Sequence, residues 1–180
     1  MNEEFSRSTV HRYFAGLAEA TFQSELGVVD PRLTDYLSDL LVRFVRSDVV
    51  HRIRGISGRP LLSVPEMIAD ASARIGDARR ELHQHIGDFT LFWAGVYPEA
   101  LRGEAANDQE EVDSTQFLNY CRYGKQSYKI ASIIESSEQS SNSAGVLGRL
   151  SEQFDLCCYG LREVRRQWEN GSGDGHIFLN

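Results

Sequence analysis

Residues 64–97 read VPEMIADASARIGDARRELHQHIGDFTLFWAGVY, and this stretch carries the longest helical pattern in the chain. Its apolar side chains recur every three or four residues, so they share one face of an α-helix. Ser63 can cap the first turn and Glu66 follows three residues later, which is the spacing of a capping box. A helix of this length would span about 50 Å. The sequence therefore predicts one long central helix, with a kink favoured near Gly87.

Four further segments share this pattern, and residues such as Gly27 and Pro31 bound them. The predicted helices cover residues 3–26, 31–46, 114–138 and 144–168. No segment alternates polar and apolar residues in the way that a strand does. We therefore predict an all-α fold, an antiparallel bundle of about five helices that includes the long central one.

The chain length of 180 residues suits one domain. We predict a single helical domain over residues 1–170 and a mobile, glycine-rich tail over residues 171–180. The bulkiest side chains on the inner helix faces are expected to be buried in one core. They are Phe89, Trp93, Phe117, Phe154 and Leu161.

The composition excludes several classes of protein. Hydrophobic residues make up 41% and charged residues 25%, which argues against global disorder. The net charge of −7 argues against nucleic-acid binding, because phosphate neutralisation needs a basic surface. The longest apolar run, residues 89–97, is shorter than the roughly 20 residues of a membrane helix. The acidic first residues lack a secretory signal, so we expect a cytoplasmic protein that binds no membrane.

The three cysteines, Cys121, Cys157 and Cys158, indicate reduced and buried thiols. An odd number that includes an adjacent pair makes a poor disulfide framework, and no C-x-x-C spacing typical of zinc sites occurs.

Asp88 is the most unusual residue of the central segment, because it stands in its apolar half. A carboxylate there needs a charged or hydrogen-bonding partner. We expect an arginine or a tyrosine hydroxyl, with Tyr120, Tyr123 and Arg122 as candidates.

Two patterns in the same segment could serve a cofactor. Glu81, His85 and Asp88 are spaced to lie on one side of a helix, which is half of a bundle metal site. The paired Glu-x-x-His pattern is absent, so an ordinary helix pair is favoured. Gly76 and Gly87 stand eleven residues apart on one face, which favours a close helix crossing over a flat bed for haem.

Aromatic and basic residues supply the other candidate binding sites. Tyr120, Tyr123 and Tyr128 could stack on a ligand or partner, although core packing is the simpler interpretation. Arg52 and Arg54 belong to an arginine-rich segment, residues 43–59, that could bind an anionic ligand or partner, although pairing with the acidic residues 104–113 or simple solvation is favoured. Asp88 is a further candidate for binding a ligand or partner.

Two stretches, GDFTLFWAGVYPE at residues 87–99 and YCRYGKQSY at residues 120–128, resemble an uncharacterised family of all-helical bacterial proteins. The resemblance covers about the central third of the chain and implies a helical fold of bacterial origin, but no activity. A weaker likeness to heme-oxygenase-like bundles rests on the Gly-Asp helix and the early histidine.

No nucleophile, phosphate-loop or dinucleotide motif occurs in the sequence. The sequence therefore favours a binding protein for a protein partner or a small ligand, with no reaction assignable and no cofactor predicted. The alternative is a haem- or metal-binding oxidoreductase on a heme-oxygenase-like or ferritin-like bundle. An apolar patch from Trp93 to Tyr97 is a candidate surface for a homodimer.

Overall fold

The computed structural model describes residues 2–45, 63–101, 110–135 and 141–171. Regular structure in these ranges is entirely helical, without a strand, and comprises seven α-helices and two short helical turns. The α-helices are α1 (Asn2–Glu19), α2 (Pro31–Val45), α3 (Val64–Ser72), α4 (Gly76–Val96), α5 (Glu110–Ile133), α6 (Ser141–Glu152) and α7 (Phe154–Gly171). A π-helical turn, η1 (Ala20–Glu25), continues α1, and a 3₁₀ turn, η2 (Pro98–Leu101), follows α4.

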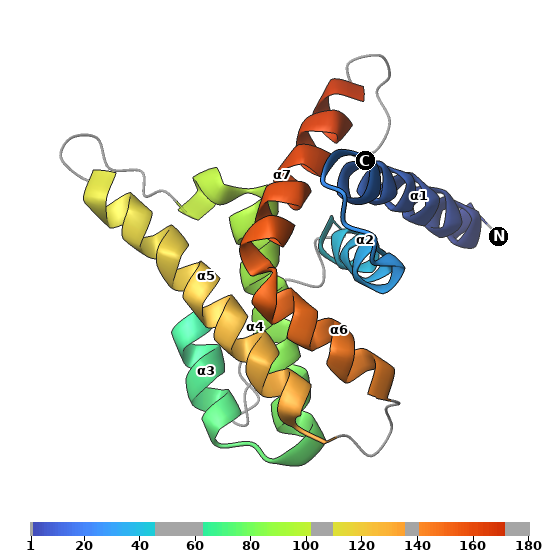
Figure 1. Cartoon of the computed structure of the whole chain (residues 1–180). Coiled ribbons are helices and arrows are strands. Elements are labelled where there is room, and N and C mark those ends of the chain that lie inside the picture. The colour runs from blue at the N-terminus through green and yellow to red at the C-terminus, as the bar shows by residue number, and fades with distance from the viewer. Residues whose placement is uncertain (1, 46–62, 102–109, 136–140, 172–180) are drawn as a thin grey trace.

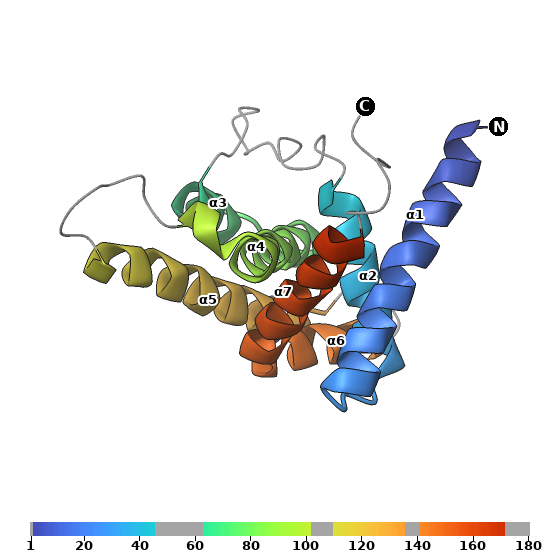
Figure 2. The same cartoon turned by 90° about the horizontal axis from the view of Figure 1, so that it is seen from above.

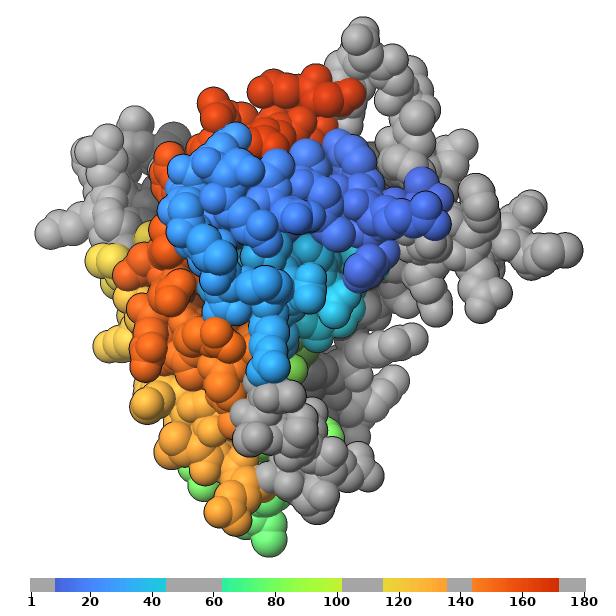
Figure 3. Space-filling view, turned by 45° about the vertical axis from the view of Figure 1, so that its right-hand side comes forward, coloured from blue at the N-terminus to red at the C-terminus, as the bar shows by residue number. Residues whose placement is uncertain are grey.

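Helix α4 lies at the centre of the molecule (Figures 1 and 2). Helices α3, α5 and α7 pack against it, and α2 also contacts it. Helices α1 and α2 lie side by side on one face, next to α6 and α7 (Figure 3). No helix among the described residues combines the length and the apolar character needed to cross a membrane.

The long central helix predicted over residues 64–97 is two helices. Its start is as expected, because Ser63 and Glu66 form the capping box, with Ser63 Oγ accepting from the backbone N–H of Glu66. The segment breaks between α3 and α4, where Gly76 has a φ of +56°, a left-handed conformation that favours glycine. Helix α4 continues through Gly87, so the interruption lies earlier than the predicted kink.

The other predicted helices also differ in detail. The segment 3–26 is α1 with its π-helical continuation, and Gly27 ends it with a φ of +67°. The segment 144–168 is divided at Gln153 into α6 and α7. This division places Phe154, the first residue of α7, in the core against Gly124 of α5. The described residues therefore hold seven α-helices rather than about five.

The hydrophobic core contains residues from each of the seven α-helices. Phe89, Phe154 and Leu161 are buried in it as predicted. Trp93 and Phe117 are only partly buried, which corrects the prediction for these two. Phe117 belongs to the first half of α5, which projects past the neighbouring helices (Figure 1). Trp93 lies at the edge of the core rather than inside it.

Glycines allow the helices to approach closely. The ring of Tyr128 on α5 lies where a side chain of Gly87 would be, 2.6 Å from the position of a Cβ atom. Rings of Phe154 and Phe22 occupy the equivalent space at Gly124 and Gly160. The close crossing expected at Gly87 is therefore present, whereas open space surrounds Gly76, the other member of the predicted pair.

We expect Gly124→Ala to lower the free energy of unfolding by about 1–3 kcal/mol, because an added methyl overpacks the core. The new Cβ would lie 2.4 Å from the Phe154 ring and 2.5 Å from Thr90 Oγ1, and both residues are fully buried. Gly145→Ala in α6 is the matched control, since nothing lies within 4 Å of its Cβ position. That variant should gain up to about 1 kcal/mol from helix propensity. Urea denaturation measures the free energy of unfolding of each variant. Equal changes in Gly124→Ala and Gly145→Ala would contradict the packing argument.

Candidate functional site

The carboxylate of Asp88 is buried at the meeting point of three helices. Tyr36 on α2 and Tyr128 on α5 donate their hydroxyls to Oδ1 of Asp88, at 2.6 and 2.7 Å. Arg43 on α2 donates from Nη1 to Oδ2 at 3.0 Å. The side chain of Asp88 is 2% exposed and that of Arg43 is 42% exposed. One buried carboxylate thus connects α2, α4 and α5 through three donors, which we call the Asp88 network.

Local sequence places each member of this network. Tyr36 and Arg43 are seven residues apart on α2, so both face α4. Gly87 precedes Asp88 and lets the Tyr128 ring lie against the α4 backbone. Gln84, one turn before Asp88, donates to the Tyr36 hydroxyl at 3.0 Å. This bond leaves the proton of the Tyr36 hydroxyl directed at Asp88.

Burial governs the protonation of the network. It raises the pKa of Asp88, while the charge of Arg43 and the hydrogen bonds from the two tyrosines oppose that rise. Burial and the neighbouring carboxylate raise the pKa of Tyr36 and of Tyr128 well above the ordinary value. Both tyrosines therefore stay protonated and act as hydrogen-bond donors.

A row of aromatic rings runs along α4 beside this network. The row comprises Phe44, His85, Phe89, Trp93 and Tyr97, which we call the aromatic strip. Neighbouring ring centres are 6.0–6.2 Å apart. The last four residues recur at every fourth position, so they lie above one another on the helix.

Other side chains border the aromatic strip. Tyr120 of α5 contacts Phe89 from the side, with ring centres 6.4 Å apart. Arg43 stands at one end, close enough to influence the titration of His85. Arg165 lies over the Tyr97 ring at the other end, 4.4 Å from its centre. The strip thus runs between two positively charged side chains.

Two nitrogens of the aromatic strip are buried without a hydrogen-bond partner among the described residues, namely Nε2 of His85 and Nε1 of Trp93. Burial, with a smaller contribution from the charge of Arg43, lowers the pKa of His85 to about 4. The imidazole is therefore neutral at physiological pH. Unpaired buried polar groups are rare in native proteins, because each costs about 1–3 kcal/mol.

The prediction for Asp88 was right in residue type and wrong in identity. An arginine and tyrosine hydroxyls do pair with it, but they are Arg43, Tyr36 and Tyr128. The expected partners lie elsewhere. Tyr120 borders the aromatic strip, and Arg122 lies over the Tyr123 ring at 5.2 Å.

Sequence reasoning missed Tyr36 and Gln84 as members of the site. It counted Arg43 with the arginine-rich segment 43–59 and not as a partner of Asp88, although the predicted helix 31–46 already placed this residue on α2. The seven-residue spacing of Tyr36 and Arg43 was the available signal, because it places two donors on one helix face. Arg52 and Arg54, the other predicted anion-binding residues, lie outside the described residues, as does the tail from residue 172 onward.

The predicted metal candidates do not assemble into a site. Glu81 is exposed, and both oxygens of Asp88 accept hydrogen bonds within the Asp88 network. Within the described ranges no group of three or more His, Cys, Asp or Glu side chains could hold a metal ion. The Tyr128 ring fills the flat bed that Gly87 would offer to a planar ligand. The patch from Trp93 to Tyr97, predicted as a dimer surface, forms one end of the aromatic strip.

Asp88→Asn should lower the free energy of unfolding by about 1–3 kcal/mol, because the carboxylate that accepts three hydrogen bonds is replaced by an amide with one acceptor oxygen. The amide nitrogen of the new side chain is itself a hydrogen-bond donor. It would therefore face Tyr36, Arg43 or Tyr128, each of which donates to Asp88 in the wild type. Asp155→Asn is the matched control, since Asp155 pairs with Lys125 at 2.7 Å while 73% exposed. That change should cost less than about 1 kcal/mol. Chemical denaturation compares the two, and similar losses would show that the Asp88 network contributes little.

The free energy of unfolding should fall as the pH drops from about 6.5 to about 4, because His85 takes up a proton only when the chain unfolds. The slope from this one group is at most about 1.4 kcal/mol per pH unit. His85→Phe keeps a ring in the strip and removes the titration. The difference between the wild-type and variant stability curves isolates His85, since all other groups are common to both. Parallel curves over this pH range would contradict the prediction.

No protein-family model, curated protein or solved structure matches this chain. The resemblance of residues 87–99 and 120–128 to an uncharacterised family of helical bacterial proteins stays a prediction, as does the likeness to heme-oxygenase-like bundles. The function is therefore inferred from the Asp88 network and the aromatic strip.

Proposed function

We propose that this protein is a binding protein that takes a small, flat, anionic ligand on the aromatic strip. The observation that carries the proposal is that two buried ring nitrogens, His85 Nε2 and Trp93 Nε1, have no hydrogen-bond partner among the described residues. They lie about two helical turns apart. A ligand with a hydrogen-bonding group near either nitrogen would recover the free energy that its burial costs. Each unsatisfied buried group in a native structure needs an explanation, and a bound ligand is the one that we propose for this pair.

The shape of the ligand follows from the rings. Trp93, Tyr97 and Tyr120 are each only partly buried, so the aromatic strip has an outer edge at which a further ring could insert. Aromatic rings prefer offset or edge-to-face contacts with other rings, and such contacts add about 0.5–1.5 kcal/mol each. A flat apolar body suits this edge better than a flexible chain does.

The charge of the ligand follows from Arg43. Its guanidinium pairs with Asp88 through Nη1, yet its side chain remains 42% exposed. Arginine presents several donors in a planar fork, so it can hold a buried carboxylate and an incoming anion together. His85 beside it is neutral, so we assign the attraction of an anion at this end of the strip to Arg43. An aromatic carboxylate would therefore match the strip and this end of it.

A titration with 2-naphthoate tests the proposal, with the uncharged 2-naphthamide as its counterpart. In a Trp168→Phe background, Trp93 is the only tryptophan, so its indole N–H gives a single NMR signal. We expect naphthoate to shift this signal and to bind more tightly than the amide. Loss of one hydrogen bond, about 1 kcal/mol, should weaken naphthoate binding about fivefold in His85→Phe.

Tyr159→Phe provides the control for this titration, because Tyr159 is half exposed on α7 and belongs to neither the strip nor the Asp88 network. It should bind naphthoate as the parent protein does. An indole signal that does not move up to the solubility limit of naphthoate would overturn the proposal. Equal affinity in the parent and in a folded His85→Phe variant would do the same.

One observation favours haem as a second candidate ligand. His85 is a neutral imidazole whose Nε2 is unpartnered among the described residues and surrounded by rings, and such a nitrogen can coordinate iron. Hemin added to the protein should then give a shifted Soret band that His85→Ala removes. His11→Gln is the control, because His11 is exposed and bonded to Asp39. A spectrum identical to free hemin would exclude this candidate.

A further inference from the structure

One face of helix α5 is exposed along most of the helix. Thr115, Leu118, Arg122, Lys125 and Lys129 recur at spacings of three and four residues, so they share this face, which we call the α5 stripe. Four of the five are exposed, and the side chain of Lys125 is 42% exposed. The first half of α5 also projects beyond its neighbours (Figures 1 and 2). The described helices therefore leave the α5 stripe uncovered.

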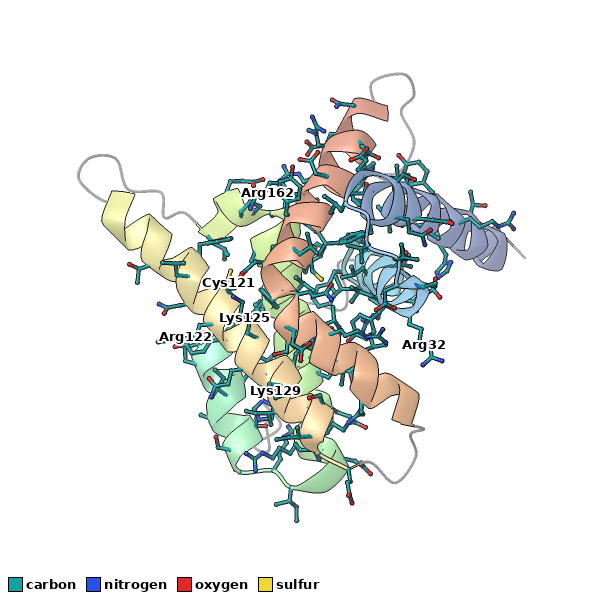
Figure 4. The ribbon with its side chains drawn as sticks, in the orientation of Figure 1. Arg32, Cys121, Arg122, Lys125, Lys129 and Arg162 are labelled. Atoms are coloured by element: carbon teal, nitrogen blue, oxygen red, sulfur yellow. The ribbon has the colours of Figure 1, made fainter. Side chains whose placement is uncertain are left out.

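The α5 stripe is basic, although the chain as a whole carries a net charge of −7. Figure 4 shows Arg122, Lys125 and Lys129 one after another along α5, and the sequence between residues 114 and 134 has no acidic residue. Lys125 pairs with Asp155 at 2.7 Å, but both side chains are open to solvent. An ammonium group has three donors, so Lys125 can hold a second carboxylate as well.

A large apolar side chain stands between this basic part of α5 and an acidic one. Leu118 is 62% exposed, and an exposed leucine alone is ordinary on a protein surface. The first turn of α5, however, has Glu110 and Glu111 in its sequence. Glu111 and Lys125 are each seven residues from Leu118, which is about two helical turns. Their positions therefore fall on the same face of α5, with Leu118 at the midpoint.

Positions 111 and 125 cannot meet within one chain, because the helix between them holds them about 21 Å apart. A two-fold axis through Leu118 brings a second α5 alongside in the opposite direction. Position 111 of each copy then lies opposite position 125 of the other, and the two leucines meet at the axis. A crossing angle of about 20°, common for packed helices, keeps positions about 10 Å from the axis within reach of a long side chain.

We propose that a second copy of this chain is the partner of the α5 stripe, in a symmetric antiparallel dimer. Each Lys125 faces position 111 of the other copy, and Leu118 packs on its counterpart. The charges favour a second copy over an unrelated partner, because one surface supplies both signs at the spacing that a two-fold axis requires. The interface is small and mostly polar, so we expect a weak, salt-sensitive dimer. The proposal is independent of ligand binding and uses other residues than the patch from Trp93 to Tyr97.

Sedimentation velocity of the full chain over a range of protein concentrations measures the monomer–dimer equilibrium. We expect the weight-average sedimentation coefficient to rise with concentration. The rise should shrink when NaCl increases from about 0.1 M to about 1 M, because the screening length falls from about 10 Å to about 3 Å. The coefficient of a monomer at every concentration up to the solubility limit would overturn the proposal.

An exchange of the two charges tests the pairing itself. Lys125→Glu should weaken the dimer at least about tenfold, because it places like charges opposite each other at two symmetric positions. Glu111→Lys should weaken the dimer for the same reason. The double variant restores opposite charges across the axis, so it should dimerise more tightly than either single variant. A double variant that dimerises no better than the single ones would contradict the pairing of these two positions.

Arg166→Glu is the matched control for Lys125→Glu. Arg166 is 66% exposed on α7 and pairs with a nearby carboxylate, that of Glu163, so the two substitutions change similar surroundings. Both variants alter the net charge of the chain by the same amount. Arg166→Glu should therefore leave the dimer intact, and an equal loss in the two variants would show that only the total charge matters.

Leu118→Ser tests the centre of the interface without changing any charge. Leu118 is exposed in the single chain, so the variant should keep the melting temperature of the monomer and weaken the dimer. Circular dichroism confirms that this variant and the charge variants are folded. A folded Leu118→Ser variant that dimerises as the wild type does would show that the copies meet at another surface, which would overturn the proposal.

Discussion

A carboxylate buried in the centre of a helical protein constrains the whole arrangement around it. An isolated charge there would cost several kcal/mol, so Asp88 must be surrounded by donors. Tyr36, Arg43 and Tyr128 meet this requirement from two other helices. Their side chains reach Asp88 only when α2, α4 and α5 take one relative position. Apolar packing alone tolerates small shifts, whereas these three hydrogen bonds tolerate few.

The same network shapes the electrostatics of the aromatic strip. Arg43 is held in place by Asp88 and by contact with the Tyr36 ring, 5.7 Å from its centre. From there its charge adds to the effect of burial and keeps His85 neutral. Nε2 of this neutral imidazole has no partner among the described residues, and it can accept or donate one hydrogen bond according to the tautomer. The buried ion pair thus supports the fold and influences the charge state of His85 in the neighbouring strip.

Helix α5 borders both parts of the candidate site. Tyr120 touches Phe89 of the aromatic strip, and Tyr128 donates to Asp88. These two tyrosines are eight residues apart, so they lie about two turns apart on the same side of the helix. A shift of α5 would therefore change the aromatic strip and the Asp88 network together.

The sequence by itself determined the all-α class, the capping box at Ser63, the helix edges at Gly27 and Pro31, and the need of Asp88 for an arginine or a tyrosine. These features depend on neighbours within a few residues, where helical periodicity and capping chemistry act. Tertiary structure alone decided that Tyr36, Arg43 and Tyr128 are the partners of Asp88. It also decided where the segment 144–168 breaks, because Phe154 must reach Gly124 on α5. Contacts between residues 40 or more positions apart depend on how helices cross, and no local pattern records that.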